Sequence, residues 1–231
     1  MAIVGMIGGL GPESTIDYYR QIISAYEERC PDAGGPPLIL NSINMKKLLA
    51  MVEAGELESL VAYLYDEVQR LANAGAEVGL ISAVTPHIVF DALQQRSPIP
   101  LISIVEATCE AAEQLGITRA GLIGTRFTMQ GRFYPEVFQR SGIKVIVPTL
   151  TEQDVVHQIY FGELVKYVIL PASRKRLLEI VRRMKDEDGI QALVLGGTEL
   201  SLLVRESAVC GIPVLDSARI HVERAVAELL R

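Results

Sequence analysis

The chain has no tryptophan and little cysteine, histidine or aromatic residue of any kind. Its 231 residues include three cysteines and three histidines, and aromatic side chains make up 6%. The cysteines, Cys30, Cys109 and Cys210, are odd in number and widely spaced, which fits a reducing compartment better than a disulfide framework. We therefore expect a cytoplasmic protein whose fold depends on no disulfide.

Signals for metals, nucleic acids and membranes are also missing. The histidines His87, His157 and His221 have no metal-ligand spacing, and no CxxC pair occurs, so no metal site is predicted. A net charge of −6 offers no basic surface for nucleic acid. No apolar run approaches the roughly 18 residues of a membrane span, and the first residues lack the basic segment of a signal peptide. We expect neither nucleic acid nor a membrane as a partner.

What the chain does contain is the pattern of an α/β protein. Hydrophobic residues make up 49% and charged residues 22%, which is typical of an ordered globular protein. Short β-branched runs alternate with amphipathic stretches, as in βαβ units around parallel sheets. Strands are predicted at 2–7, 38–42, 77–83, 100–104, 119–123, 144–147, 191–195 and 212–215. Helices are predicted at 13–29, 56–74, 87–95, 105–115, 130–141, 151–165, 172–187 and 217–230.

Two parts of the sequence repeat at a nearly constant offset. Gly8 ends one apolar run and Gly124 ends another, 116 positions later (124 − 8). Thr85 and Thr198 each follow an apolar run directly, 113 positions apart (198 − 85). Such self-similarity indicates a duplicated architecture. We therefore predict two similar lobes that face one site.

Proline and glycine clusters suggest where the chain passes between the lobes. Ser97-Pro98-Ile99-Pro100 interrupts both helix and strand pairing, and Gly211-Ile212-Pro213 is a candidate return. These positions predict an N-terminal lobe of residues 1–98 plus 209–231, and a C-terminal lobe of residues 99–208.

Hydroxyl side chains follow the predicted strands at the points where ligands bind in α/β proteins. Thr85 and Thr198 follow two of these strands, and Thr125 follows a third. Their hydroxyl groups and the neighbouring amides can donate hydrogen bonds to a carboxylate. A helix cap is the alternative for each threonine, and the matched pair favours a ligand site.

A glycine-rich turn joins the first predicted strand to the first helix. In Gly8-Gly9-Leu10-Gly11-Pro12-Glu13-Ser14-Thr15, free amides at a helix start suit an anion. The spacing is not GxGxxG, which argues against a dinucleotide. An ordinary turn capped by Ser14 or Thr15 is the alternative.

Three further polar residues lie near the predicted strand ends or after a helix. His87 can titrate near neutrality beside Thr85, or it can be a packed residue of a helix's first turn. Glu199 is the corresponding polar group after Thr198 and can orient the backbone or a ligand. Lys166 is either a solvated cation at a helix end or a counter-charge for a dicarboxylate.

Six ordered blocks together make the chain resemble the aspartate/glutamate racemase family, which is related to the hydantoin racemases. Besides the glycine-rich turn, the blocks are Thr85-Pro86-His87, Ile102-Ser103-Ile104-Val105-Glu106-Ala107-Thr108, Gly124-Thr125-Arg126-Phe127-Thr128-Met129, Gly196-Gly197-Thr198-Glu199-Leu200, and Pro213-Val214-Leu215-Asp216-Ser217 with Ile220-His221. The resemblance covers nearly the whole chain. It implies two flavodoxin-like lobes with parallel sheets, pseudo-twofold symmetry, a cleft between the lobes, and a homodimer.

The resemblance also implies amino-acid racemisation without pyridoxal phosphate or any other cofactor. In that family two cysteines flank the substrate α-carbon, and one removes the proton that the other replaces. Aligned on the threonines, the two cysteine positions are Ala83 and Gly197 here, and Val84 replaces the usual asparagine. Cys109 and Cys210 lie outside the matching strand ends. The usual thiol pair is therefore absent.

The anion-binding positions of the family are better kept. The resemblance implies a small carboxylate or amino-acid ligand. The substrate-binding positions that it implies are Gly9, Leu10, Thr15, Thr85, Thr125, Lys166 and Thr198. The catalytic candidates that remain are His87, Thr85, Thr198 and Glu199. Three functions fit these residues: an isomerase with a replacement acid/base group, a lyase or decarboxylase on the same scaffold, and a catalytically silent carboxylate-binding protein.

Overall fold

The computed structural model describes residues 2–231, and these divide into two compact units. Unit 1 comprises the chain up to Ser103 together with His221–Arg231, and unit 2 comprises Ile104–Ile220. Each unit contains its own sheet, and every pairing but one is parallel. The predicted α/β class with two parallel sheets is confirmed.

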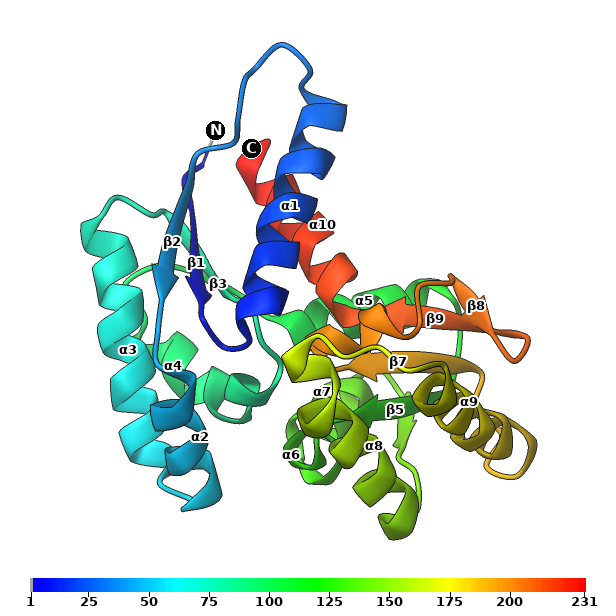
Figure 1. Cartoon of the computed structure of the whole chain (residues 1–231). Coiled ribbons are helices and arrows are strands. Elements are labelled where there is room, and N and C mark those ends of the chain that lie inside the picture. Colours follow the sequence, from blue (N-terminus) through cyan, green and yellow to red (C-terminus); the bar gives the residue numbers. More distant parts are fainter. Residues whose placement is uncertain (1) are drawn as a thin grey trace. The chain divides into compact units, whose positions relative to one another are not determined.

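Unit 1 has a four-stranded sheet in the order β2-β1-β3-β4. Its strands are β1 (Val4–Gly8), β2 (Leu38–Ser42), β3 (Val78–Ile81) and β4 (Leu101–Ile102). Its helices are α1 (Pro12–Arg29), α2 (Met45–Glu53), α3 (Leu57–Asn73), the 3₁₀ helix η1 (Thr85–Val89), α4 (Phe90–Arg96) and most of α10 (Ser217–Leu229). Helices α1 and α3 cover opposite faces of this sheet (Figure 1), as right-handed crossovers in opposite directions require.

Unit 2 has a five-stranded sheet in the order β6-β5-β7-β9-β8, in which β8 is antiparallel. Its strands are β5 (Arg119–Gly124), β6 (Lys144–Ile146), β7 (Ala192–Gly196), β8 (Ala208–Val209) and β9 (Ile212–Asp216). Its helices are α5 (Ile104–Gln114), α6 (Arg126–Gln130), α7 (Phe133–Arg140), α8 (Leu150–Gly162), η2 (Leu164–Lys166), α9 (Pro171–Asp186) and η3 (Thr198–Leu202).

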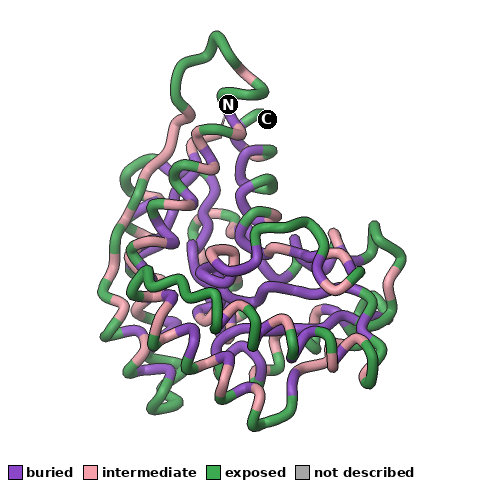
Figure 2. Tube along the Cα trace, turned by 45° about the vertical axis from the view of Figure 1, so that its right-hand side comes forward, coloured by how far each residue is buried: buried purple, intermediate pink, exposed green. Residues whose placement is uncertain are grey.

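The central strands form the buried core of each unit. Every residue of β1, β3 and β7 is buried, whereas the edge strands β2 and β6 are partly exposed. The buried stretches of the chain trace accordingly run through the middle of each unit (Figure 2). Continuous apolar runs are what a strand covered on both faces requires. None of the helices formed by residues 2–231 has the length and hydropathy needed to span a membrane.

The two units repeat one topology. The order β2-β1-β3-β4 corresponds to β6-β5-β7-β9, so the offset predicted from the sequence reflects a structural duplication. Ile99-Pro100 before β4 and Ile212-Pro213 in β9 also lie 113 positions apart (213 − 100). Both Ile-Pro pairs therefore mark equivalent strands.

Each half of the chain contributes its last helix to the other unit. Helix α5 follows β4 of unit 1 but belongs to unit 2, and α10 follows β9 of unit 2 but belongs to unit 1 from His221 onward. The predicted boundaries at 98 and 208 therefore move to 103 and 220. The reason is that β9, which we placed in the first lobe, pairs with β7.

Equivalent tyrosines bind the two exchanged helices. In unit 1, the Tyr18 hydroxyl bonds to Nδ1 of His221 on α10 at 3.1 Å. In unit 2, the Tyr134 hydroxyl bonds to Thr108 on α5 and to the Ser217 hydroxyl at 3.1 Å. Tyr134 lies 116 positions after Tyr18 (134 − 18), the offset that also relates Gly8 to Gly124. The exchanged helices are thus fixed by a duplicated contact.

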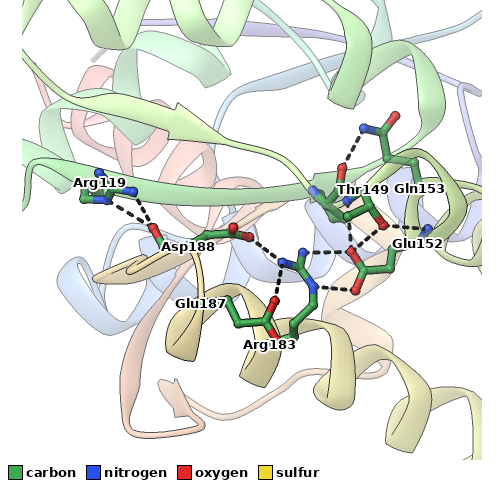
Figure 3. Close-up of polar contacts among 8 residues, drawn as sticks. Arg119, Thr149, Glu152, Gln153, Arg183, Glu187 and Asp188 are labelled. Atoms are coloured by element: carbon green, nitrogen blue, oxygen red, sulfur yellow. Dashed lines mark hydrogen bonds and ion pairs between the residues drawn. The ribbon is translucent and has the colours of Figure 1, made fainter.

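An arginine joins α8 to α9 in unit 2. Arg183 on α9 donates to both carboxylate oxygens of Glu152 at 2.6 and 2.8 Å, and to Asp188 at 2.7 Å (Figure 3). Glu152 is also the third residue of a capping box in which the Thr149 side chain caps α8. The N-terminal cap of α8 and the last turns of α9 therefore belong to one hydrogen-bonded network.

Candidate active site

Ligands of doubly wound sheets bind at the carboxyl ends of the strands, where neighbouring crossovers leave in opposite directions. That point lies between β1 and β3 in unit 1, and between β5 and β7 in unit 2. All but one of the candidate residues follow these four strands. They are Gly9, Leu10 and Thr15 after β1; Thr85 and His87 after β3; Thr125 after β5; and Thr198 and Glu199 after β7.

The glycine-rich turn after β1 is held by its own threonine. Gly9 has a φ of +80°, and a Cβ there would lie 2.6 Å from the carbonyl oxygen of Ile43, so glycine is needed. The Thr15 hydroxyl accepts from the Gly9 amide at 2.9 Å and donates to the Gly11 carbonyl at 3.0 Å. Thr15 therefore stabilises the turn, and its hydroxyl proton is donated to a carbonyl of the turn itself.

The end of β3 is apolar at the position where the resemblance places the first thiol of the family. Ala83 and Val84 are 7% and 3% exposed, and neither can exchange a proton. Ser82 donates to the Ile7 carbonyl at 3.1 Å and accepts at its own carbonyl from Ser14 at 3.2 Å, which ties β3 to β1 and α1. Thr85 follows as the first residue of η1 and is partly exposed.

His87 is a packed residue of unit 1. Its Nδ1 donates to the Ala83 carbonyl at 3.1 Å, because a carbonyl can only accept, and its ring stacks on Phe90 with centroids 5.0 Å apart. Desolvation, helped by the nearby His221, lowers the pKa of His87 to about 3. The pKa therefore lies well below the neutral range expected from the sequence, and the ring is neutral at pH 7.

Thr125 caps the short helix after β5. Its hydroxyl oxygen accepts from the Thr128 amide at 3.2 Å and lies 3.1 Å from the Thr128 hydroxyl. The capping alternative is therefore correct for Thr125.

A buried acidic cluster stands at the end of β7. The Glu199 carboxyl is 3% exposed, and its Oε2 accepts from the Thr198 hydroxyl at 2.9 Å and from the Tyr160 hydroxyl. Desolvation raises the pKa of Glu199 against the opposing effect of these two hydrogen bonds. Desolvation also raises the pKa of Tyr160, and the Glu199 charge adds to that effect. Two hydroxyl groups therefore converge on one oxygen of a buried carboxyl close to a strand end.

Tyr160 was not predicted from the sequence. It lies on α8, where an aromatic residue at a helical spacing is typical of core packing, and it does belong to the core of unit 2. The one signal in the sequence is Gly197, which replaces a larger residue of the family pattern. The structure shows why: a Cβ on Gly197 would lie 2.5 Å from Cε2 of the Tyr160 ring.

Lys166 is the candidate that does not follow a strand. It ends η2 and is exposed, and η2 contacts η3, the turn that begins at Thr198. Its element therefore lies beside the end of β7. A role for Lys166 as a counter-charge stays a prediction.

Known proteins share both the sequence pattern and the fold of the chain. The profile of the family described as Asp/Glu/Hydantoin racemase matches residues 7–225. The crystal structure of a Yersinia pestis protein named as a candidate Asp/Glu racemase is 32% identical, with a TM-score of 0.91 and full coverage of both chains. An aspartate racemase homologue from Pyrococcus horikoshii OT3 is also 32% identical, with a TM-score of 0.86 and full coverage of both chains.

A curated relative covers less of the chain. A glutamate racemase from Hydrogenobaculum is 27% identical over 155 residues, which cover 63% of this chain and 55% of that protein. Taken with the duplicated fold and the polar residues at its strand ends, the profile match decides the family. The chain belongs to the Asp/Glu/hydantoin racemase family.

Proposed function

We propose that this protein binds a small carboxylate or amino acid and moves a proton at the carbon next to the carboxylate, without pyridoxal phosphate or another cofactor. The observation that carries the proposal is the buried Glu199 carboxyl beside Thr198 at the end of β7. Burial raises the pKa of this carboxyl, and carboxyls with a raised pKa are among the groups that proteins use as general acids and bases.

The binding half of the proposal rests on hydrogen-bond donors at the strand ends. In unit 2 these are the amides that begin η3 and the ammonium group of Lys166 on the adjoining η2, while a ligand contact of Thr125 stays a prediction. Thr85 and the Gly9–Leu10 turn are the corresponding groups of unit 1. That one cleft unites both sets stays a prediction.

The chemistry that we propose acts on one face of the substrate. The acid/base group follows β7, whereas β3 is followed by Ala83, Val84 and a neutral His87 whose Nδ1 proton is bonded to the main chain. A single base removes the α-proton and returns it to the same face. We therefore expect rapid exchange of the α-hydrogen with solvent and much slower inversion of configuration.

Exchange in deuterated water tests this proposal. L-aspartate, L-glutamate and their D-isomers are incubated with the protein, and loss of the α-proton signal is followed by nuclear magnetic resonance. Glu199→Gln should slow exchange by about 100-fold or more, since general acid/base groups contribute that much. Glu206→Gln is the matched control, because this carboxylate pairs with Arg174 at the surface. Absence of both α-hydrogen exchange and inversion of configuration from every incubation would rule out these substrates.

Decarboxylation is the second candidate, and the apolar end of β3 favours it. Ala83 and Val84 form a wall that stabilises a departing neutral molecule better than a carboxylate. The bond between the α-carbon and one carboxylate breaks, carbon dioxide leaves, and the electron pair left on carbon takes one proton from the protein. The test is to incubate the protein with malonate and 2-methylmalonate and to measure carbon dioxide. No release from either compound would count against decarboxylation.

Ligand binding without either reaction would indicate a silent carboxylate-binding protein. That outcome would appear as a higher melting temperature in the presence of a dicarboxylate without turnover. The homodimer that the resemblance implies is a separate expectation, which sedimentation equilibrium can check.

A further inference from the structure

We infer that the phenol of Tyr160 has taken the place of the second thiol of the family and, as one pair with Glu199, exchanges the proton with the substrate carbon. This inference rests on the proposed function and names the group that would carry it out. Tyr160 comes from α8, whereas the residue it replaces would belong to the end of β7.

The first argument is that a side chain at position 197 and the Tyr160 ring exclude each other. A Cβ on Gly197 would lie 2.5 Å from Cε2, 3.2 Å from Cζ and 3.3 Å from the hydroxyl oxygen of Tyr160. The φ of Gly197 is −165°, an extended conformation that any residue adopts. The backbone therefore does not require glycine at 197, and the ring does.

The second argument is the position of the polar end of that ring. The ring edge at Cε2 and the hydroxyl group both lie within 3.3 Å of the place that a Cβ of residue 197 would take at the strand end. Tyr160 is 7% exposed, so its hydroxyl reaches this point from within the core of unit 2. A phenylalanine would fill the same volume without placing an ionisable group there.

The third argument is that the hydroxyl has a proton acceptor. Tyr160 donates to Oε2 of Glu199, and Thr198 donates to the same oxygen at 2.9 Å. Two ionisable side chains buried against one another cost desolvation energy that an apolar pair would avoid. Such pairs occur preferentially where a protein needs a group that can change its protonation state.

The proton transfer balances within this pair. As the substrate C–H bond breaks, its electron pair stays on carbon, and the proton forms a new O–H bond on Tyr160. The proton that Tyr160 held before passes to Glu199, which changes from carboxylate to carboxylic acid. The reverse sequence returns a proton to the substrate. For decarboxylation, the same phenol protonates the carbon, and solvent then restores the proton to the pair.

Removal of one hydroxyl group tests the role of Tyr160. Tyr160→Phe should slow α-hydrogen exchange, or carbon dioxide release from malonate, by at least 100-fold while KM changes less than threefold. The control is Tyr134→Phe, because Tyr134 is also fully buried in unit 2 and its hydroxyl is also hydrogen-bonded. The control should retain turnover within about threefold. Equal turnover in the wild type and Tyr160→Phe would overturn this inference and leave the proposed function intact.

A second test measures the packing of residue 197 against Tyr160 through protein stability. Gly197→Cys should lower the melting temperature, and adding Tyr160→Ala should recover part of the loss, because the smaller side chain frees the space. The double variant should also catalyse faster α-hydrogen exchange than Tyr160→Ala alone. Iodoacetamide should abolish this gain, because it alkylates the new thiol. A Gly197→Cys variant as stable as the wild type would show that the ring does not occupy this place and would overturn the inference. Wild-type protein that neither binds nor turns over these carboxylates would instead overturn the proposed function first.

Discussion

At the scale of single residues, unit 1 contains two neutral histidines in its core. Nε2 of His221 donates to the Ile102 carbonyl at 3.0 Å, so its Nδ1 accepts from Tyr18. The rings of His87 and His221 lie 6.2 Å apart. Desolvation lowers the pKa of His221 to about 4. The pKa of His87 is lowered to about 3 by desolvation and by the nearby His221. Both side chains are thus uncharged, hydrogen-bonded residues of the core.

This pair should make the stability of unit 1 depend on pH. In the unfolded chain a histidine takes up its proton near pH 6.5, whereas in the native protein the uptake is delayed to about pH 4 and about pH 3. Between these values the unfolded chain binds more protons, so the free energy of unfolding falls as the pH falls below 6.5.

Urea unfolding followed by circular dichroism at pH 7.5, 6, 5 and 4.5 measures this fall, since the chain has no tryptophan for fluorescence. His221→Gln can keep the bond to the Ile102 carbonyl and should make the fall shallower. His87→Asn should do the same through the other ring. A pH dependence that neither substitution changes would contradict these assignments.

The sequence predicted which residues follow the strands but not what those residues contact. Thr198 and Glu199 could be placed at a strand end because an apolar run stops there. Tyr160 could not, because its partner lies 39 positions away and only the tertiary fold of unit 2 brings the two together. The roles of Thr15 and Thr125 as turn and cap residues likewise depend on local geometry that the motif alone leaves open.

At the scale of elements, the network around Arg183 connects helices α8 and α9 through charged side chains. The side chains of Arg183 and Glu152 are 22% and 19% exposed. Partial burial opposes ionisation of Glu152, but hydrogen bonds from Arg183 and Thr149 outweigh it and lower its pKa. The contribution of Glu152 to stability is therefore present above about pH 4.5 and is lost as the pH falls further.

Arg183→Met should destabilise unit 2 by about 1–3 kcal/mol, because it leaves the carboxylates of Glu152 and Asp188 without their partner. Arg132→Met is the matched control: it breaks the exposed pair with Glu136 and should cost less than about 0.5 kcal/mol. Chemical unfolding of both variants gives the comparison. Equal losses would show that the network adds nothing beyond a surface ion pair.

Long elements were predicted more reliably than short ones. Helix α3 was predicted within one residue at each end because its apolar face recurs over seventeen residues. Helices α2 and α6 and strand β8 were missed. Strand β8 has two residues and α6 has five, which is too short for a period to show, and α6 is defined chiefly by its cap at Thr125.

At the scale of the whole molecule, the duplicated offset predicted two similar halves, but the boundaries depended on which sheet β9 joins. Pairing partners far apart in sequence leave no local signal, and both Ile-Pro pairs suit a crossover equally well. The consequence is that α10 stabilises unit 1 although the strand before it belongs to unit 2. Its buried residues Val222, Ala225 and Val226 face the core there.

Val226→Ala should therefore weaken unit 1 rather than β9, its nearest strand in sequence. We expect a loss of about 1.5–3 kcal/mol from the missing methyl groups and the cavity. Hydrogen exchange should become faster at the amides of β1 and β3 while those of β7 and β9 stay protected. Val181→Ala, the same substitution at a fully buried site of α9, should give the opposite pattern. Loss of protection in β9 with Val226→Ala would contradict the exchange of helices.

The exchanged helices also set the order in which the protein can be completed during synthesis. Residues up to Ser103 leave the ribosome before those of unit 2, yet their unit lacks α10 from His221 onward until residues 221–231 have been translated. Unit 2 already holds all of its own elements by then, because α5 is made before the sheet that it joins. Unit 1 therefore starts to emerge before unit 2 but is completed after it, and Tyr18 cannot form its hydrogen bond to His221 until that residue has been made.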